Sequence, residues 1–375
     1  MSAPTHASTL PDLFALHDLP ARWRQRRIFT LADTHFGGAR FLDAWRRWRA
    51  DDARCDRLHV IAVGTLADLD AKPADDADPR AAQLVRAWPM RVPGVHRLAF
   101  DSGRVVLTLA IGNDDGGLSK LWARVDAFHL DAFALADTKR IAKTLARFAD
   151  DDATVTANAD ETTLTSLSDA LRASGFECDT HTRTLLRARF TPRWRVRRHE
   201  PPRANDAALR AQMRHAIVIG TGLASCAITA RLASRGWRIT LIDRHALPAR
   251  DASGNPAGVF HPIVWRDDSV AARLTRVGFL SARDAWRGLE EAGHELHHSR
   301  AGLLQIADTP EDAEALAAAI TQFDYPREYV IAASDDDATR IADMPVTRGG
   351  WFFPHGGAVS PAAICAAHSP MPASA

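Results

Sequence analysis

The stretch that most constrains the fold is HAIVIGTGLASCAITARLASRGWRITLIDR, residues 215 to 244. The apolar run AIVIG predicts a buried strand, and Gly220 and Gly222 follow it. The next run, LASCAITARLASRG, predicts a helix that ends at Gly236, and RITLIDR predicts a second strand that ends on Asp243. A strand, a glycine turn, a helix and a strand in this order provide the context that a dinucleotide-binding fingerprint needs.

Each residue of this fingerprint has a physical role to fill. Gly220 permits the tight turn, and Gly222 lets the backbone approach a pyrophosphate at the helix N-terminus, where free N–H groups favour an anion. Asp243 can accept hydrogen bonds from ribose hydroxyls. Ser225 stands where a third glycine is usual, and we expect so small a side chain to loosen the packing only slightly. A βαβ unit without a ligand is the alternative, and the fingerprint alone does not choose between FAD and NAD.

The length and charge of the chain limit its class. The 375 residues leave room for two domains, each with its own core. The 47 Lys and Arg residues are almost balanced by 46 Asp and Glu residues. The net charge therefore creates no electrostatic field that would favour binding to nucleic acid or to a membrane surface. The N-terminal MSAPTHASTL lacks the pattern of a secretory signal, and no window approaches the apolar run of roughly 18 residues that a membrane helix needs. We therefore expect a cytoplasmic protein without a membrane segment.

The cysteines carry no signal of a metal site. The four thiols are widely spaced and form no CxxC pair, a pattern typical of ordinary buried residues. They are Cys55, Cys178, Cys226 and Cys365.

The residues in front of the fingerprint alternate between strand-like and helix-like runs. This alternation predicts an α/β domain with a largely parallel sheet covered by helices. The expected strands are IFTLAD, RLHVIAV, RVVLTLAIG, VDAFHLDAF and ATVTANA, and the expected helices are ARFLDAWRRWRA, LVRAWP, TKRIAKTLARFA and TTLTSLSDALRASGF.

We expect a first domain over residues 1–190, a linker over 191–213 and a second domain over 214–375. The linker is rich in arginine and proline and has little apolar periodicity. It is either a solvated connector or an RNA contact, in which the arginines pair with phosphates and Trp194 stacks on a base. The arginines in question are Arg193, Arg195, Arg197 and Arg198.

Two segments after the fingerprint resemble the FAD-dependent amine oxidases of the D-amino-acid-oxidase family. They are ASGNPAGVFHP, residues 252–262, and GGWFFPHGGAVSPAAICAA, residues 349–367. The resemblance implies FAD as the cofactor, with the first segment running past its phosphates and ring. It places Ser253, Gly254 and Gly258 on the flavin side. His261 is a candidate catalytic residue near the ring, with a packed loop histidine as the alternative.

The same segments are more closely similar to bifunctional tRNA-modifying enzymes that join such an oxidase to a methyltransferase. In the front of the chain, FTLADTHFGGARFLDAW, residues 29–45, resembles the loop that holds S-adenosylmethionine and keeps Gly37 and Gly38. VDAFHLDAFALA, residues 125–136, resembles the segment that carries the acid near the transferred methyl, and Asp131 matches that acid. The acid expected after LHVIAV, which would bind the ribose, is replaced by Gly64.

The resemblance implies a Rossmann-like methyltransferase domain followed by a partial, D-amino-acid-oxidase-like FAD-binding Rossmann domain. The implied activity is modification of the tRNA wobble uridine: FAD-dependent removal of the carboxymethyl group from 5-carboxymethylaminomethyl-2-thiouridine, then S-adenosylmethionine-dependent methylation to 5-methylaminomethyl-2-thiouridine. Rival interpretations are an FAD-dependent oxidase of a small free amino acid and a non-catalytic tRNA-binding remnant.

Two departures from the family pattern lead to further expectations. Because Gly64 offers no ribose acceptor, we expect weak or no binding of S-adenosylmethionine, improved by Gly64→Glu. Because the tail AAHSPMPASA lacks apolar periodicity, we expect the second domain to be incomplete at its C-terminus, with oxidase turnover absent or very low.

Overall fold

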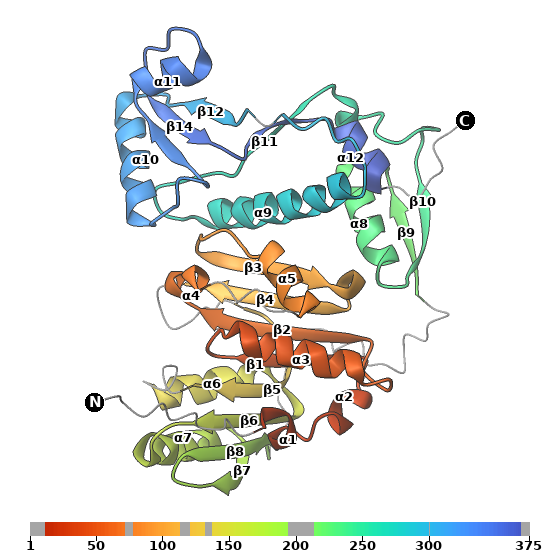
Figure 1. Ribbon diagram of the computed structural model, residues 1–375, viewed down its shortest axis with the longest axis vertical. Coiled ribbons are helices and arrows are strands. Elements are labelled where there is room, and N and C mark those ends of the chain that lie inside the picture. The colour runs from red at the N-terminus through yellow and green to blue at the C-terminus, as the bar shows by residue number, and fades with distance from the viewer. Residues whose placement is uncertain are drawn as a thin grey trace. The chain divides into compact units, whose positions relative to one another are not determined.

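A computed structural model describes residues 12–71, 78–112, 121–131, 137–193, 214–299 and 301–368 (Figure 1). The chain divides into two compact units, one of residues 1–86 and 97–208 and one of residues 87–96 and 209–375. Both units combine helices with sheets, so the predicted α/β class is confirmed. Most of the predicted linker, residues 194–213, lies outside the described residues, and with it Trp194, Arg195, Arg197 and Arg198.

The first unit is built around an eight-stranded sheet of order β3-β4-β2-β1-β5-β6-β8-β7. Its central strands are parallel, and β4 and β5 are buried throughout, as expected where helices cover both faces of a sheet. The elements are α1 Leu13–Leu16, α2 Ala21–Arg24, β1 Ile28–Asp33, α3 Gly38–Ala50, β2 Arg57–Gly64, α4 Leu66–Asp70, α5 Pro79–Arg86, β3 Gly94–Phe100, β4 Val105–Ile111, β5 Val125–Leu130, α6 Thr138–Phe148, β6 Ala149–Asn158, α7 Glu161–Ala173, β7 Phe176–His181 and β8 Leu185–Phe190.

The order of the strands reverses between β1 and β5. From β1 the chain proceeds to β2 and β4 on one side, whereas β5 and β6 continue on the other. In open parallel sheets, ligands bind outside the carboxyl ends of the strands at such a switch point. The ends of β1 and β5, at Asp33 and Leu130, therefore mark where the first unit is expected to bind a ligand.

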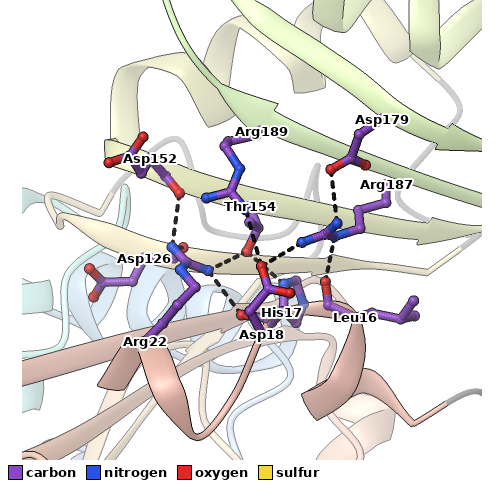
Figure 2. A network of polar contacts seen from close by, with 10 residues as sticks. All are labelled: Leu16, His17, Asp18, Arg22, Asp126, Asp152, Thr154, Asp179, Arg187 and Arg189. Atoms are coloured by element: carbon purple, nitrogen blue, oxygen red, sulfur yellow. Dashed lines mark hydrogen bonds and ion pairs between the residues drawn. The ribbon is translucent and has the colours of Figure 1, made fainter. Parts of the chain in front are cut away.

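Two antiparallel strands at the edge of this sheet, β7 and β8, were not among the expected strands. Strand β8 and its neighbour β6 hold the N-terminal segment through a network of polar contacts (Figure 2). Arg22 of α2 donates to Thr154 Oγ1 at 2.7 Å and to the Asp152 carbonyl at 2.9 Å. Arg187 of β8 donates to the Leu16 carbonyl and to the Asp18 carboxylate, both at 2.6 Å. The segment before β1 is thus fixed onto the far half of the sheet.

The second unit holds three small sheets. Strands β9 and β10 are parallel, β11 pairs with β15, and β12, β14 and β13 form an antiparallel sheet over a core that includes Phe279, Tyr329 and Phe353. The elements are β9 His215–Ile219, α8 Leu223–Ala233, β10 Arg238–Ile242, β11 Gly258–Phe260, α9 Val270–Glu291, β12 Leu303–Ile306, α10 Pro310–Gln322, β13 Ile331–Ala333, α11 Asp335–Ala342, β14 Gly350–Phe353, β15 Gly357–Val359 and α12 Pro361–His368.

The described residues include no helix long and apolar enough to cross a membrane. Three of the four thiols, Cys55, Cys226 and Cys365, are buried as predicted, whereas Cys178 is half-buried. Cys226 of α8 and Cys365 of α12 belong to one small apolar cluster with Ala249, which helps to hold α12 against α8.

Candidate functional site

The glycine turn of the second unit has the predicted order of elements, β9, turn, α8 and β10. Gly220 follows β9 and adopts a φ of 92°, a left-handed conformation that glycine enters without steric cost. Its N–H donates to the Ile242 carbonyl of β10 at 2.8 Å. The turn is thereby tied to the neighbouring strand, and the chain reverses directly into α8.

Gly222 is the residue before the first turn of α8, and it is closely covered. A Cβ added to Gly222 would lie 2.9 Å from Ser253 Oγ. The same hydroxyl accepts a hydrogen bond from the N–H of Leu223, the first residue of the helix, at 3.1 Å. Ser253, predicted for the flavin side, is therefore brought to the N-terminus of α8, next to the place where a pyrophosphate is expected to sit.

Asp243 follows β10 and its carboxylate is held in place by two donors. Thr221 Oγ1 donates to Oδ2 at 2.6 Å, and the N–H of His245 donates to Oδ1 at 2.8 Å. These hydrogen bonds lower the pKa of Asp243, the one from Thr221 having the larger effect. The carboxylate is thus ionised at neutral pH and fixed beside the glycine turn, as a ribose acceptor requires.

Ser225 fits the position at which a third glycine is usual. Its hydroxyl donates to the Ile219 carbonyl at 3.3 Å and lies 3.5 Å from where a Cβ on Gly220 would stand. The serine side chain therefore fills the gap between helix and strand and bonds to β9.

The loop that follows β10 is compact around two of the predicted glycines. A Cβ on Gly254 would lie 2.6 Å from the Ala249 carbonyl oxygen, and one on Gly258 would lie 3.2 Å from Pro361 Cγ of α12. Both positions therefore allow the backbone to pass closer than a larger residue permits.

His261 lies farther along the same segment and is half-buried. Its Nδ1 lies 2.9 Å from the carbonyl oxygen of Pro262, so this nitrogen carries the proton and donates. The ring packs against Phe353 of β14, with the ring centroids 5.5 Å apart. These contacts attach His261 to the antiparallel sheet, and its predicted place near a flavin ring stays a prediction.

In the first unit, three charged residues meet at the switch point. Arg40, in the first turn of α3, lies 3.2 Å from Asp33 at the end of β1 and 3.4 Å from Asp131 after β5. Gly37 directly precedes α3, and Gly38 is its first residue. The structure thus brings the predicted glycines and Asp131 to one place. Sequence reasoning did not single out Asp33 or Arg40, although their positions beside the glycine loop could have drawn attention to both.

The environment of Asp33 is unusual for a carboxyl group. Burial raises the pKa of Asp33 to about 6, and Arg40 beside it opposes that rise. Asp131 is held by its backbone, because its N–H donates to Thr34 Oγ1 at 3.0 Å. Two acids of different exposure therefore stand at the ends of neighbouring strands.

A cavity of about 210 Å³ opens next to this cluster, between α3 and the face of the sheet. It is smaller than the clefts of about 300–1,000 Å³ that typically hold small-molecule ligands. Its walls include Leu31, Asp33, Arg40, Phe41, Ala127 and His129. Among the described residues, no group of three or more His, Cys, Asp or Glu side chains is arranged to hold a metal ion.

Comparison with known proteins gives matches over both units. Residues 215–368 match a family described as FAD dependent oxidoreductase, and residues 75–179 match one described as S-adenosyl-L-methionine-dependent methyltransferase. In solved structures, MNMC2 from Aquifex aeolicus is similar at 14% identity over 48% of this chain and 58% of that chain, with a TM-score of 0.33, too low to support an inference.

Curated relatives match nearly the whole chain. It is 49% identical over 374 residues to the tRNA 5-methylaminomethyl-2-thiouridine biosynthesis bifunctional protein MnmC of Paraburkholderia phymatum, covering 94% of this chain and 56% of that protein. The protein of the same description from Paraburkholderia xenovorans is 48% identical over 369 residues, covering 93% and 55%. The chain spans about half the length of the relatives it matches. Because the identity extends across both units, the chain belongs to the family of bifunctional proteins called MnmC.

Proposed function

We propose that this chain acts on the wobble uridine of tRNA in two steps. The first is FAD-dependent oxidative removal of the carboxymethyl group from 5-carboxymethylaminomethyl-2-thiouridine. The second is S-adenosylmethionine-dependent methylation of the resulting amine to 5-methylaminomethyl-2-thiouridine. The observation that carries the proposal is that one chain matches both an FAD-dependent oxidoreductase family and a methyltransferase family, with a glycine turn in each unit.

The turn of the second unit suits FAD, because Gly220 adopts the left-handed turn, Gly222 brings no side chain to the start of α8, and Asp243 offers an ionised, oriented acceptor. Ser225 keeps the helix against the strand. On the flavin side the proposal places three further residues, Ser253, Gly254 and Gly258.

FAD, when bound, supplies a hydride acceptor. The substrate loses a hydride from the carbon between its nitrogen and its carboxylate, and a proton from that nitrogen, which leaves a carbon–nitrogen double bond. Water adds to this bond, and the carbon–nitrogen bond then breaks. The products are the aminomethyl uridine and a two-carbon oxo acid. His261 is a candidate to orient the substrate, since its Nε2 is the nitrogen left free to accept when Nδ1 donates to the Pro262 carbonyl.

The second step needs an unprotonated amine in line with a methyl group. In the first unit, the residues that suit S-adenosylmethionine are Gly37 and Gly38 at the start of α3, where the turn lies beside the cavity wall. The amine nitrogen attacks the methyl carbon, the carbon–sulfur bond breaks, and the nitrogen loses a proton. We assign Asp131, which lies at the switch point beside Arg40, to orient the amine and accept that proton.

The experiment uses the purified full chain and tRNA that carries the carboxymethylaminomethyl group. We expect flavin absorbance bands in the visible and, at a very low rate, conversion to the aminomethyl nucleoside without S-adenosylmethionine and to the methylaminomethyl nucleoside with it. Mass spectrometry of digested tRNA measures both products. Absence of flavin and of both nucleosides would overturn the proposal. Oxidation of free glycine or sarcosine, with tRNA left unchanged, would favour the free amino-acid oxidase instead. The proposed substrate places the protein in the cytoplasm, with tRNA as its partner.

A further inference from the structure

The ribose acid that the sequence lacks belongs at the end of β2. Strand β2 lies beside β1, with Asp33 in register with Ala62, so its carboxyl end opens onto the same edge of the sheet as the switch point. That end is Gly64, which is buried and has no side chain. A nucleoside bound at this edge needs an acceptor for its two ribose hydroxyls, and residue 64 cannot supply one.

The space in front of Gly64 is occupied by another carboxylate. A Cβ added to Gly64 would lie 3.0 Å from Asp68 Oδ2 and 3.4 Å from Asp68 Cβ. The first distance is within the reach of an acidic side chain attached at residue 64 itself. The Asp68 carboxylate therefore lies within one side-chain length of the Cβ that an acid at position 64 would have.

The start of α4 holds Asp68 in this orientation. Thr65 precedes the helix, and its N–H donates to Asp68 Oδ2 at 2.6 Å while its hydroxyl donates to the same oxygen at 3.0 Å. This reciprocal cap turns the carboxylate back toward the end of β2. Both hydrogen bonds that the described residues make to this carboxylate reach Oδ2, and Asp68 is half-buried, so Oδ1 is left to accept from a ligand.

We propose that Asp68 accepts hydrogen bonds from the ribose hydroxyls of S-adenosylmethionine, in place of an acid at position 64. This proposal rests on the proposed methyltransferase function. An ionised carboxylate only accepts hydrogen bonds, and each of its oxygens has two lone pairs. Oδ1 can therefore accept a hydrogen bond from a ribose hydroxyl while Oδ2 keeps its hydrogen bonds from Thr65. If Asp68 has this role, Gly64 no longer implies weak binding of S-adenosylmethionine. The ribose acceptor is then present four residues after Gly64, in α4.

The test measures calorimetric binding of S-adenosylhomocysteine, and of its 2′,3′-dideoxy derivative, to the full chain. Asp68→Asn keeps an oxygen for the Thr65 N–H and removes the charge, and Asp70→Asn, an exposed acid on the same helix, is the matched control. We expect Asp68→Asn to weaken S-adenosylhomocysteine at least tenfold and to leave the dideoxy derivative unchanged. Asp70→Asn should alter neither.

The outcomes separate the two proposals. If the unaltered chain binds neither ligand, the proposed methylation is lost together with the role of Asp68. If it binds and Asp68→Asn has no effect, or weakens both ligands equally, only the role of Asp68 is overturned, because a purely structural cap does not distinguish the two ligands.

Moving the acid from position 68 to position 64 gives a second test of the proposal by the same binding measurement. Gly64→Glu alone introduces a side chain that meets Asp68 Oδ2 and Ile111 Cδ1, at 3.0 and 3.3 Å from its Cβ, and places two carboxylates together. We therefore expect this change to weaken S-adenosylhomocysteine, and Gly64→Glu combined with Asp68→Ala to restore it. Improved binding by Gly64→Glu alone would overturn the assignment.

Discussion

Arg40 and Asp33 form an ion pair in which a nitrogen of the guanidinium lies 3.2 Å from the carboxylate at the end of β1. The pair is only partly solvated, with 27% of the Arg40 side chain and 13% of the Asp33 side chain exposed. Because Arg40 also contacts Asp131, one cation balances two acids that come from neighbouring strands. The ion pair therefore fixes the start of α3 at the edge where we place the methyltransferase site.

Removal of this cation should destabilise the first unit in a pH-dependent way. Asp33 has a raised pKa of about 6, so its contribution to stability is largest at low pH and is lost as the pH rises through that value. Without Arg40 the ionised carboxylate is uncompensated. We expect Arg40→Ala to lower the free energy of unfolding by about 1–3 kcal/mol at pH 8 and by less at pH 5.

Urea denaturation at the two pH values measures this difference. Arg46→Ala is the control, since Arg46 is exposed and pairs with Asp43 and Asp78 at the surface, where an ion pair contributes about 0–1 kcal/mol. An equal loss in both variants, or a loss independent of pH, would contradict the role given to Arg40.

A second pH effect comes from two buried histidines, His17 in the segment before β1 and His129 in β5. Burial lowers the pKa of His17 to about 3 and of His129 to about 4, and nearby arginines act in the same direction. Both rings are bonded to threonine hydroxyls of β6 and must be neutral in the folded state. Their contribution is present above pH 6.5 and is lost as the pH falls, by about 2 kcal/mol for each ring at pH 5.

We expect His17→Gln to be less stable than the unaltered chain at pH 7.5 and to lose less stability between pH 7.5 and pH 5. Unfolding by urea, followed through the circular dichroism of the full chain, measures both quantities. A variant that loses as much stability on acidification as the unaltered chain would exclude His17 as a source of the acid sensitivity.

The elements that local patterns predicted are those with a continuous apolar face. Strands β4 and β5 are buried throughout and β1 is partly buried, and their apolar runs were sufficient to identify them. Strand β8 has the alternation of a half-buried strand, with Arg187 and Arg189 between its buried residues, but it leads directly into the arginine-rich linker and was not distinguished from it. The partner of both arginines is Asp18, about 170 positions earlier, which no local pattern can reveal.

In the candidate sites too, residues within one local motif could be predicted from the sequence, whereas contacts between distant segments could not. The order of strand, glycine turn, helix and strand followed from spacing alone, because Gly220, Gly222 and Asp243 lie within one βαβ unit. The contact of Ser253 with the N-terminus of α8 spans thirty positions and depends on how the intervening loop folds. The approach of Asp68 to Gly64 depends on the cap of a short helix. Such side-chain placements come from tertiary packing, and periodicity does not encode them.

Ser225→Gly should show that the serine in the fingerprint is not an obstacle to FAD. Glycine removes the hydroxyl that bonds to the Ile219 carbonyl and adds backbone freedom in the first turn of α8. We expect the variant to keep its FAD content and to lose about 1 kcal/mol in free energy of unfolding. Flavin absorbance and urea denaturation measure the two effects, and a large gain in flavin affinity would mean that Ser225 impairs the site.

Gly222→Val should abolish FAD binding. The added Cβ would lie 2.9 Å from Ser253 Oγ, and the valine methyl groups would fill the space through which the backbone approaches a pyrophosphate. The matched control is Gly288→Ala in α9, where a Cβ meets nothing within 4 Å and alanine favours the helix. Purified samples of both variants are compared by visible absorbance, with far-ultraviolet circular dichroism to confirm that each is folded. We expect the control to retain its flavin and the folded Gly222→Val variant to have none. A folded Gly222→Val variant with unchanged flavin content would show that FAD does not use this turn.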